Sequence, residues 1–225
     1  MSIQTTTAQQ AIQIRINYQR LKRLLDLVFT LLVLPPLCIV MIIVAVLIRL
    51  DSPGPIFFRQ RRIGQNGVEF DLYKFRSMYI NSDDTLHRRS IEQFMADQPL
   101  NDGSTPHLLY KRIKDPRVTR VGRFIRKTSI DEIPQFFNVL RGEMSLVGPR
   151  PPLPYEVEKY TPKDHLRLSG KPGLTGPWQV YARCQVPFSI MVEMDIAYLQ
   201  EQSLWQDIKL IFLTIPVMIL GRGGA

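Results

Sequence analysis

Cysteine and histidine are scarce in this sequence, and their scarcity excludes several kinds of site. The 225 residues include 2 cysteines and 3 histidines. Cys38 and Cys184 lie far apart and form no CxxC motif, which argues against both a disulfide-stapled secreted domain and a cysteine-ligated metal site, and which fits a reducing compartment. His87, His107 and His165 are isolated from one another, so we assign them no role.

The glycine-rich loops that usually bind phosphate are also missing. The sequence contains neither a Walker A motif nor GxGxxG, and no Ser-His-Asp arrangement is legible. Acidic residues are outnumbered, because 20 Asp and Glu oppose 29 Lys and Arg, for a net charge of +9. This balance favours an anionic partner: nucleic acid, anionic lipid or a phosphorylated substrate. The length predicts one domain, or one domain with an appended anchor.

One uncharged apolar run, Leu27 to Ile48, is about as long as the ~20 residues that a membrane span needs. The alternatives are a signal peptide and a buried core helix. The residues that follow, 49–55, read RLDSPGP and contain no small-residue cleavage site, which favours a membrane segment. We therefore divide the chain into an anchor over residues 1–52 and a catalytic domain over residues 53–225.

Pro35 and Pro36 lie in the middle of this run, where they break or kink a helix. The two halves would rise about 12 and 18 Å at ~1.5 Å per residue, so neither crosses a ~30 Å hydrocarbon core alone. Both flanks are basic, which indicates that both ends stay on one side of the membrane. We predict a re-entrant helix-break-helix; a spanning helix with a proline kink is the alternative. We expect Asp26 at the headgroup level or paired with a nearby base. The basic flanks are Arg15, Arg20, Lys22 and Arg23 before the run, and Arg49, Arg59, Arg61 and Arg62 after it.

The domain after the anchor shows a few local patterns. Residues 64–67, GQNG, predict a hairpin turn between two strands, the second of which alternates over 68–73. Residues 79–110 are polar, helical in part and broken at 101–104, and their role is open. The apolar stretch 208–220 is too short to span and predicts an interfacial helix with Trp205 as a headgroup-level anchor, or a core helix.

The acidic pair Asp131 and Glu132 has two compatible interpretations. Ser129 and Glu132 match the S-x-x-E capping box, and Asp131 is the competing N-cap. Apolar residues then recur with helical spacing up to Gly142, at Ile133, Phe136, Phe137 and Leu140. In either register the two carboxylates stand at a helix N-terminus, where bound phosphate is also favoured.

Arginines near this pair favour chemistry on a phosphate. Arg126 precedes Asp131 by five residues, and Arg150 lies in a stiff Gly-Pro-Arg-Pro turn. Guanidinium groups bind phosphate oxygens bidentately. A pyrophosphate beside two carboxylates would need Mg²⁺, which accepts both kinds of oxygen.

Motifs along almost the whole chain resemble the bacterial sugar transferases, the monotopic polyprenyl-phosphate phosphoglycosyl transferases, in their minimal form. The block RKTSIDEIPQFFNVLRGEMSLVGPRP over residues 126–151 is the densest match. The others are Lys22-Arg23-x-x-Asp26, the Pro53-Gly54-Pro55 motif that continues to Gly64, Lys74-Phe75-Arg76-Ser77-Met78, Asp115-Pro116-Arg117-Val118-Thr119-x-x-Gly122, and Pro172 to Gly176 with Gln179 and Arg183.

The resemblance implies a reaction and roles for the site residues. A sugar 1-phosphate would pass from a UDP-sugar to undecaprenyl phosphate, releasing UMP, in the first membrane step of polysaccharide or glycoconjugate assembly. Asp131 would be the nucleophile that forms a covalent phosphosugar intermediate. Glu132 would bind Mg²⁺ and assist proton removal from the acceptor, and Lys74, Arg126 and Arg150 would contact phosphates.

The resemblance also implies a fold and a location. We expect an α+β, mainly helical domain with the re-entrant anchor, a small β-hairpin and interfacial amphipathic helices, on the cytoplasmic face of the bacterial inner membrane. Its partners would be donor, acceptor and membrane lipid, without nucleic acid, and a homodimer is compatible with this. The alternatives are a membrane-anchored basic scaffold or lipid-binding protein and a UDP-sugar phosphohydrolase. The sequence does not identify the sugar.

Overall fold

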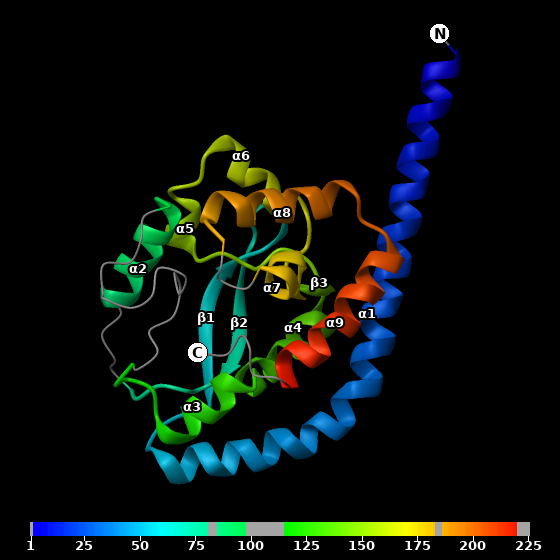
Figure 1. The fold of residues 1–225 in the computed structure, drawn as a ribbon. Helices are drawn as coiled ribbons and strands as arrows, with labels where there is room; N and C mark the ends of the chain where they lie inside the picture. The colour runs from blue at the N-terminus through cyan, green and yellow to red at the C-terminus, as the bar shows by residue number, and fades with distance from the viewer. Residues whose placement is uncertain (1, 81–84, 98–114, 183–185, 220–225) are drawn as a thin grey trace.

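The computed structural model describes residues 2–80, 85–97, 115–182 and 186–219, and most of these residues are helical (Figure 1). The predicted break at residues 101–104 and the motif position Arg183 lie outside the described residues. In chain order the elements are α1 (Ser2–Asp51), β1 (Phe57–Ile63), η1 (Gln65–Gly67), β2 (Glu69–Phe75), α2 (Thr85–Met95), α3 (Arg120–Lys127), η2 (Ile130–Gln135), α4 (Phe136–Arg141), β3 (Ser145–Val147), α5 (Pro154–Val157), α6 (Pro162–His165), η3 (Leu166–Ser169), β4 (Gly173–Thr175), α7 (Pro177–Tyr181), α8 (Phe188–Gln200) and α9 (Leu204–Ile219).

The predicted hairpin is present. Strands β1 and β2 pair antiparallel, from Phe57 opposite Phe75 to Ile63 opposite Glu69. The turn takes two left-handed residues, Asn66 with φ of 56° and Gly67 with φ of 81°, a conformation that asparagine and glycine adopt more readily than other residues. A second pair of strands, β3 and β4, is parallel. The helices and the β1–β2 hairpin confirm the expected fold, which is mainly helical with a small antiparallel sheet.

The predicted break does not appear as a non-helical gap, because α1 is helical from Ser2 to Asp51 with Pro35 and Pro36 included, and the re-entrant arrangement stays a prediction. The helix bends instead, and its two parts run in different directions, the second of them beneath the domain toward α3 (Figure 1). We attribute the bend to the proline pair, whose rings and missing N–H groups distort the hydrogen-bond ladder. By length and composition the segment Ile16–Asp51 could cross a membrane.

The first part of α1 docks onto the domain through buried polar groups. Lys22 is 6% exposed, and its Nζ lies 2.8 Å from Asp207 Oδ2 of α9 and 3.1 Å from the hydroxyl of Tyr198. One helical turn further on, the carboxylate of Asp26 accepts hydrogen bonds from the Ser145 hydroxyl and the Leu146 amide at the start of β3. Asp26 is thus buried and hydrogen-bonded to β3, with the charge of Lys22 acting on its carboxylate, and its level relative to lipid headgroups stays a prediction.

Several residues of the basic flanks also serve the fold. Arg23 donates to the carbonyls of Val139 and Leu140 at the end of α4. Arg62, 4% exposed, donates to the carbonyl of Pro151. Lys22, Arg23 and Arg62 thus bind groups of the protein itself. The inference from basic flanks that both ends of the anchor stay on one side of the membrane therefore depends on the remaining flank residues.

The second part of α1 packs on one face only. Met41, Val44 and Ile48 are buried in a cluster with Phe75, Ile125 and Ile133. The opposite face leaves large apolar side chains exposed, and it is a surface suited to lipid: Ile39, Ile42, Ile43, Val46, Leu47 and Leu50, with Leu31 and Leu32 exposed just before the prolines.

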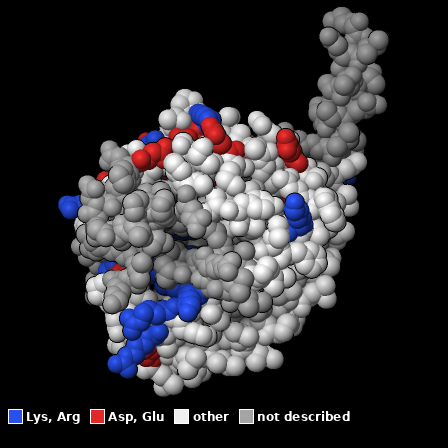
Figure 2. Space-filling model, viewed as in Figure 1, with Lys and Arg blue, Asp and Glu red and all other residues white. Residues whose placement is uncertain are grey.

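Helix α9 has the core face that one predicted alternative requires, and the interfacial alternative stays a prediction. Leu210 and Ile211 are buried in the core with Val139, whereas Phe212 is 67% exposed and Trp205 is 75% exposed. One face of α9 is thus a core face and the other adds to the apolar surface of α1, and the corresponding side of the molecule carries few charges (Figure 2).

A buried ion pair joins α8 to η3. The guanidinium of Arg167 lies 2.5 Å from Asp195 Oδ2 and 2.9 Å from the hydroxyl of Tyr160, and the side chains of Arg167 and Asp195 are 3% and 0% exposed. Burial raises the pKa of Asp195 to about 6, opposed by the charge of Arg167. The carboxyl group therefore remains ionised at neutral pH.

We expect Asp195→Asn to lower the free energy of unfolding by about 3–5 kcal/mol, because it leaves the Arg167 charge buried without its counter-ion. Glu193→Gln is the matched control, since Glu193 lies on the same helix and pairs with Lys163 at 52% side-chain exposure. An exposed pair contributes about 1 kcal/mol or less. Denaturant unfolding of the two purified variants measures the difference, and equal losses would contradict the assignment.

Candidate functional site

The acidic pair lies on η2, which follows α3 after a turn at Thr128 and Ser129. The predicted capping box is wrong: Ser129 occupies the N-cap position but adopts a left-handed conformation, φ 56°, and its side chain caps no amide. Its backbone serves both helices instead, since its N–H donates to the Arg126 carbonyl and its C=O accepts from the Glu132 amide. The turn therefore connects α3 to the acidic pair through backbone hydrogen bonds.

The predicted apolar face of the following helix is correct only in part. Ile133 is buried, but Phe137 is 39% exposed, while Asn138 and Val139 are fully buried. The prediction assumed one α-helix from residue 133. Pro134 lies within a 3₁₀ segment that has about 3.0 residues per turn, so the α-helical phase starts again at Phe136.

Lys74 meets the acidic pair directly. Its Nζ lies 2.7 Å from Glu132 Oε1, with side-chain exposures of 17% for Lys74 and 34% for Glu132. Side-chain alternation along β2 places Lys74 on the same face as the buried Leu72, toward the core. Asp131, one residue before Glu132, is 9% exposed. The structure therefore brings together three of the five predicted site residues.

Arg126 lies in the last turn of α3, partly buried. Lys and Arg side chains gather over this helix (Figure 2), with Arg120, Arg123 and Lys127 exposed. The charge of Arg126 acts on Asp115, whose pKa is held below its usual range mainly by a hydrogen bond from Arg117, with Arg126 contributing a smaller part. Arg126 thus belongs to a group of basic side chains on α3, the helix directly before the acidic pair.

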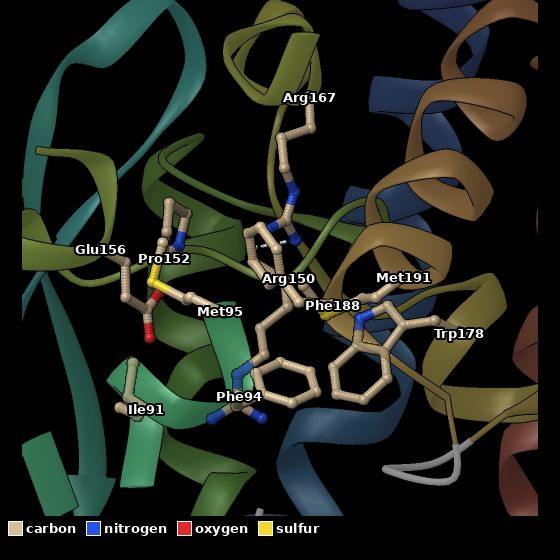
Figure 3. Close-up of a pocket in the computed structure, with 10 residues that line it drawn as sticks. All are labelled: Ile91, Phe94, Met95, Arg150, Pro152, Glu156, Arg167, Trp178, Phe188 and Met191. Atoms are coloured by element: carbon tan, nitrogen blue, oxygen red, sulfur yellow. Dashed lines mark hydrogen bonds between the residues drawn. The ribbon is translucent and has the colours of Figure 1, made fainter. Parts of the chain in front are cut away.

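Arg150 lies in a different setting. It lines a small pocket together with Phe94 of α2, Trp178 of α7 and Phe188 of α8 (Figure 3). The cavity measures about 20 Å³, and neither Asp131 nor Glu132 belongs to its wall. Within the described part of the chain, the buried Nε1 of Trp178 has no acceptor.

The backbone around Arg150 is held at every carbonyl from residue 149 to 152. Gly173 N–H donates to Pro149, the Arg167 guanidinium to Arg150, the Arg62 guanidinium to Pro151, and Ile63 N–H to Pro152. Gly148 cannot carry a side chain here, because a Cβ would lie 2.3 Å from the Lys171 carbonyl oxygen. The prediction of a stiff turn is supported, and hydrogen bonds from three other segments, β1, η3 and β4, hold the turn in addition to its prolines.

Few side chains of the site could bind a metal ion. Among the described residues no group of three or more His, Cys, Asp and Glu side chains comes together. The chain thus offers the neighbouring carboxylates of Asp131 and Glu132. Mg²⁺ commonly binds through one or two carboxylates plus substrate phosphates and water, so this pair fits Mg²⁺ bound together with a phosphorylated substrate.

Sequence reasoning missed Asn138, which is 0% exposed and bonds to the backbone of β2. The sequence does contain an indication of this role, because asparagine is disfavoured in helix interiors and here stands within an otherwise apolar helical segment.

Comparisons with known proteins agree with this architecture. The family model described as bacterial sugar transferase matches residues 17–221. The galactosyl transferase CpsE of Streptococcus agalactiae is 46% identical over 203 residues, which cover 90% of this chain and 43% of that protein. The exopolysaccharide production protein ExoY of Sinorhizobium fredii is 40% identical over 204 residues, covering 90% of this chain and 87% of ExoY.

The name of a third relative includes both substrates of its reaction. The UDP-glucose:undecaprenyl-phosphate glucose-1-phosphate transferase of Escherichia coli is 37% identical over 203 residues, covering 87% of this chain and 39% of that protein. The chain thus spans about two-fifths of the length of CpsE and of the Escherichia coli relative. The family match covers nearly the whole chain and includes the acidic pair with its Lys74 partner, and the chain belongs to the bacterial sugar transferase family.

Proposed function

We propose that this protein transfers a sugar 1-phosphate from a UDP-sugar to undecaprenyl phosphate and releases UMP. The observation that carries the proposal is the Lys74–Glu132 contact of 2.7 Å, which places a cation beside two adjacent carboxylates. The apolar face of α1 supplies the surface at which a lipid-borne acceptor could approach. The names of the relatives support the donor and the acceptor class.

In this proposal Asp131 is the nucleophile. One of its carboxylate oxygens attacks the β-phosphorus of the UDP-sugar, the bond to the α-phosphate oxygen breaks, and UMP leaves with that electron pair. An oxygen of undecaprenyl phosphate then attacks the same phosphorus and displaces Asp131, so the two displacements divide one transfer into two steps. Burial of Asp131 to 9% exposure limits the access of water to the reacting carboxylate.

Lys74 and Glu132 prepare the site for phosphate. The ammonium group of Lys74 offsets the charge of Glu132 and offers further N–H donors to a phosphate oxygen. Bound Mg²⁺ would offset charge on the pyrophosphate and the leaving UMP, held by Glu132 with Asp131 adjacent. We assign Arg126 and Arg150 to phosphate contacts, Arg126 from α3 and Arg150 from its stiff turn.

We further propose that α1 is re-entrant, with both ends at the cytoplasmic face. The docking of Lys22 and Asp26 on one part of α1 and of Met41, Val44 and Ile48 on the other supports this arrangement, because both parts pack on the same domain. A helix that crossed the bilayer would have to leave one of these contacts.

Purified protein with Mg²⁺, undecaprenyl phosphate and a panel of UDP-sugars is expected to release UMP and form a lipid-linked sugar phosphate in equal amounts, because the same phosphorus leaves the donor and reaches the acceptor. Chromatography of nucleotides and extracted lipids measures both. UMP and sugar phosphate without a lipid product would identify a hydrolase, and no turnover with any donor would favour a scaffold.

Asp131→Asn is expected to lower turnover by about 10³-fold or more, since the amide is a poor nucleophile at phosphorus. Glu158→Gln, an exposed carboxylate on the same domain, is the control and should keep wild-type turnover. Membrane recovery and unfolding temperature are measured for both variants. A folded Asp131→Asn protein with normal turnover would contradict the nucleophile assignment.

Membrane topology is tested with single cysteines in a background that lacks Cys38 and Cys184. Arg20→Cys and Val68→Cys replace exposed residues before and after the apolar segment. The re-entrant arrangement predicts that an impermeant maleimide labels both in inverted membrane vesicles and neither in intact spheroplasts. Labelling of Arg20→Cys from outside the spheroplasts would establish a spanning helix.

A further inference from the structure

Asn138 is a fully buried amide that joins α4 to the outer edge of β2. Its Oδ1 accepts from the backbone N–H of Tyr73 at 3.2 Å, and its Nδ2 donates to the backbone carbonyl of Asp71 at 2.7 Å. The same Nδ2 lies 2.7 Å from Glu143 Oε2. Every polar atom of the Asn138 side chain is therefore occupied by one strand and one neighbouring carboxylate.

An amide suits this position because of the way a strand edge presents its groups. Residues two apart on a strand direct their backbone N–H and C=O groups to the same edge, so Tyr73 offers a donor and Asp71 an acceptor side by side. A carboxamide carries an acceptor and a donor on one planar group and can bond to both. An ionised carboxylate of the same size has no donor for Asp71 or Glu143.

The two elements joined by Asn138 also carry the ion pair of the site. Strand β2 continues from Tyr73 to Lys74, and α4 continues without interruption from η2, which bears Glu132. The segment from η2 to α4 thus contacts β2 through the Lys74–Glu132 pair and the Asn138 amide, and Arg141 at the end of α4 adds an exposed hydrogen bond to the Tyr73 hydroxyl. A shift of α4 along β2 would change all three contacts.

We propose that Asn138 is a positioning residue for the transfer reaction: its bidentate contact with β2 sets the register that holds Lys74 against Glu132 beside Asp131. The inference rests on the proposed function, and it assigns Asn138 no contact with substrate. It predicts that loss of the amide reduces kcat more than it changes KM for the UDP-sugar, because the alignment of the reacting groups is lost while most donor contacts remain.

The main test compares Asn138→Asp with wild type by steady-state kinetics. At pH 8 kcat is expected to fall about 10²-fold, the loss that a misplacement of about 1 Å produces, while KM changes less than about threefold. The introduced carboxyl faces the Asp71 carbonyl and the Glu143 carboxylate, which favour its protonated form. When protonated it again has one donor and one acceptor, so the ratio of variant to wild-type kcat should rise about tenfold between pH 8 and pH 6.

Gln200→Glu is the matched control, an exposed amide-to-carboxylate change at the end of α8, and it should follow the wild-type pH profile. Asn138→Leu keeps the side-chain size without polar atoms; its kcat should be low at both pH values. Hydrogen exchange of the 70–76 peptide gives a readout apart from activity, and we expect faster exchange in Asn138→Leu because the Tyr73 amide loses its acceptor.

Two outcomes would overturn the inference. One is a folded Asn138→Leu protein with wild-type kcat. The other is an Asn138→Asp protein whose kcat loss equals its loss of folded fraction and does not recover at low pH. If Asn138→Asp does not fold, Asn138→Leu carries the test. Absence of turnover in the wild-type protein would instead contradict the proposed function. In that case hydrogen exchange of the 70–76 peptide in Asn138→Leu would still test whether Asn138 holds β2.

Discussion

The docking of α1 through buried charge is the constraint on which the rest of the structure depends. Lys22 and Asp207 lie 2.8 Å apart with side-chain exposures of 8% and 0%, and removing one partner of such a pair leaves a buried charge without compensation. Asp26 adds hydrogen bonds to β3. The polar groups of Lys22, Asp26 and Asp207 are paired together only when α1 is docked, so the first part of this long apolar helix belongs to the core of the domain.

Other side chains of α1 bind the backbone of the segments next to the candidate site. Arg23 binds the last carbonyls of α4, and Asp26 binds the first residues of β3, so α1 holds both ends of the connection that follows the acidic pair. At its other end α1 is capped by Arg76, which donates to the carbonyls of Ser52 and Pro53 one residue after β2 ends. The segments carrying Glu132 and Lys74 are therefore both connected by hydrogen bonds to the long apolar helix α1.

The sequence predicted what depends on local patterns. The hairpin turn follows from Asn66 and Gly67, and the apolar run and its proline bend follow from composition. The capping box failed because Ser129 also ends α3, and no pattern in the sequence shows that one residue must serve two helices. The hydrogen bonds of Asp26 were not predicted, because its partners, Ser145 and Leu146, are distant in sequence.

The sequence predicted only those residues of the candidate site whose side chains can themselves take part in the reaction or bind a phosphate. The resemblance to the sugar transferases selected Asp131, Glu132 and Lys74, and the structure brings these together. Arg150 was also selected, but its surroundings depend on hydrogen bonds to backbone carbonyls from three separate segments. Asn138 escaped prediction because its role depends on the edge of a strand more than sixty residues earlier.

The central claim is that Asp131 becomes covalently bound to the sugar phosphate. Intact-protein and peptide mass spectrometry after incubation with Mg²⁺ and a UDP-sugar that is turned over, without acceptor, tests it most directly. The account predicts a mass increase of one sugar phosphate on the peptide containing Asp131, lost when undecaprenyl phosphate is added. Full conversion of donor and acceptor with the protein unmodified at every time point, or an adduct on another residue, would contradict it.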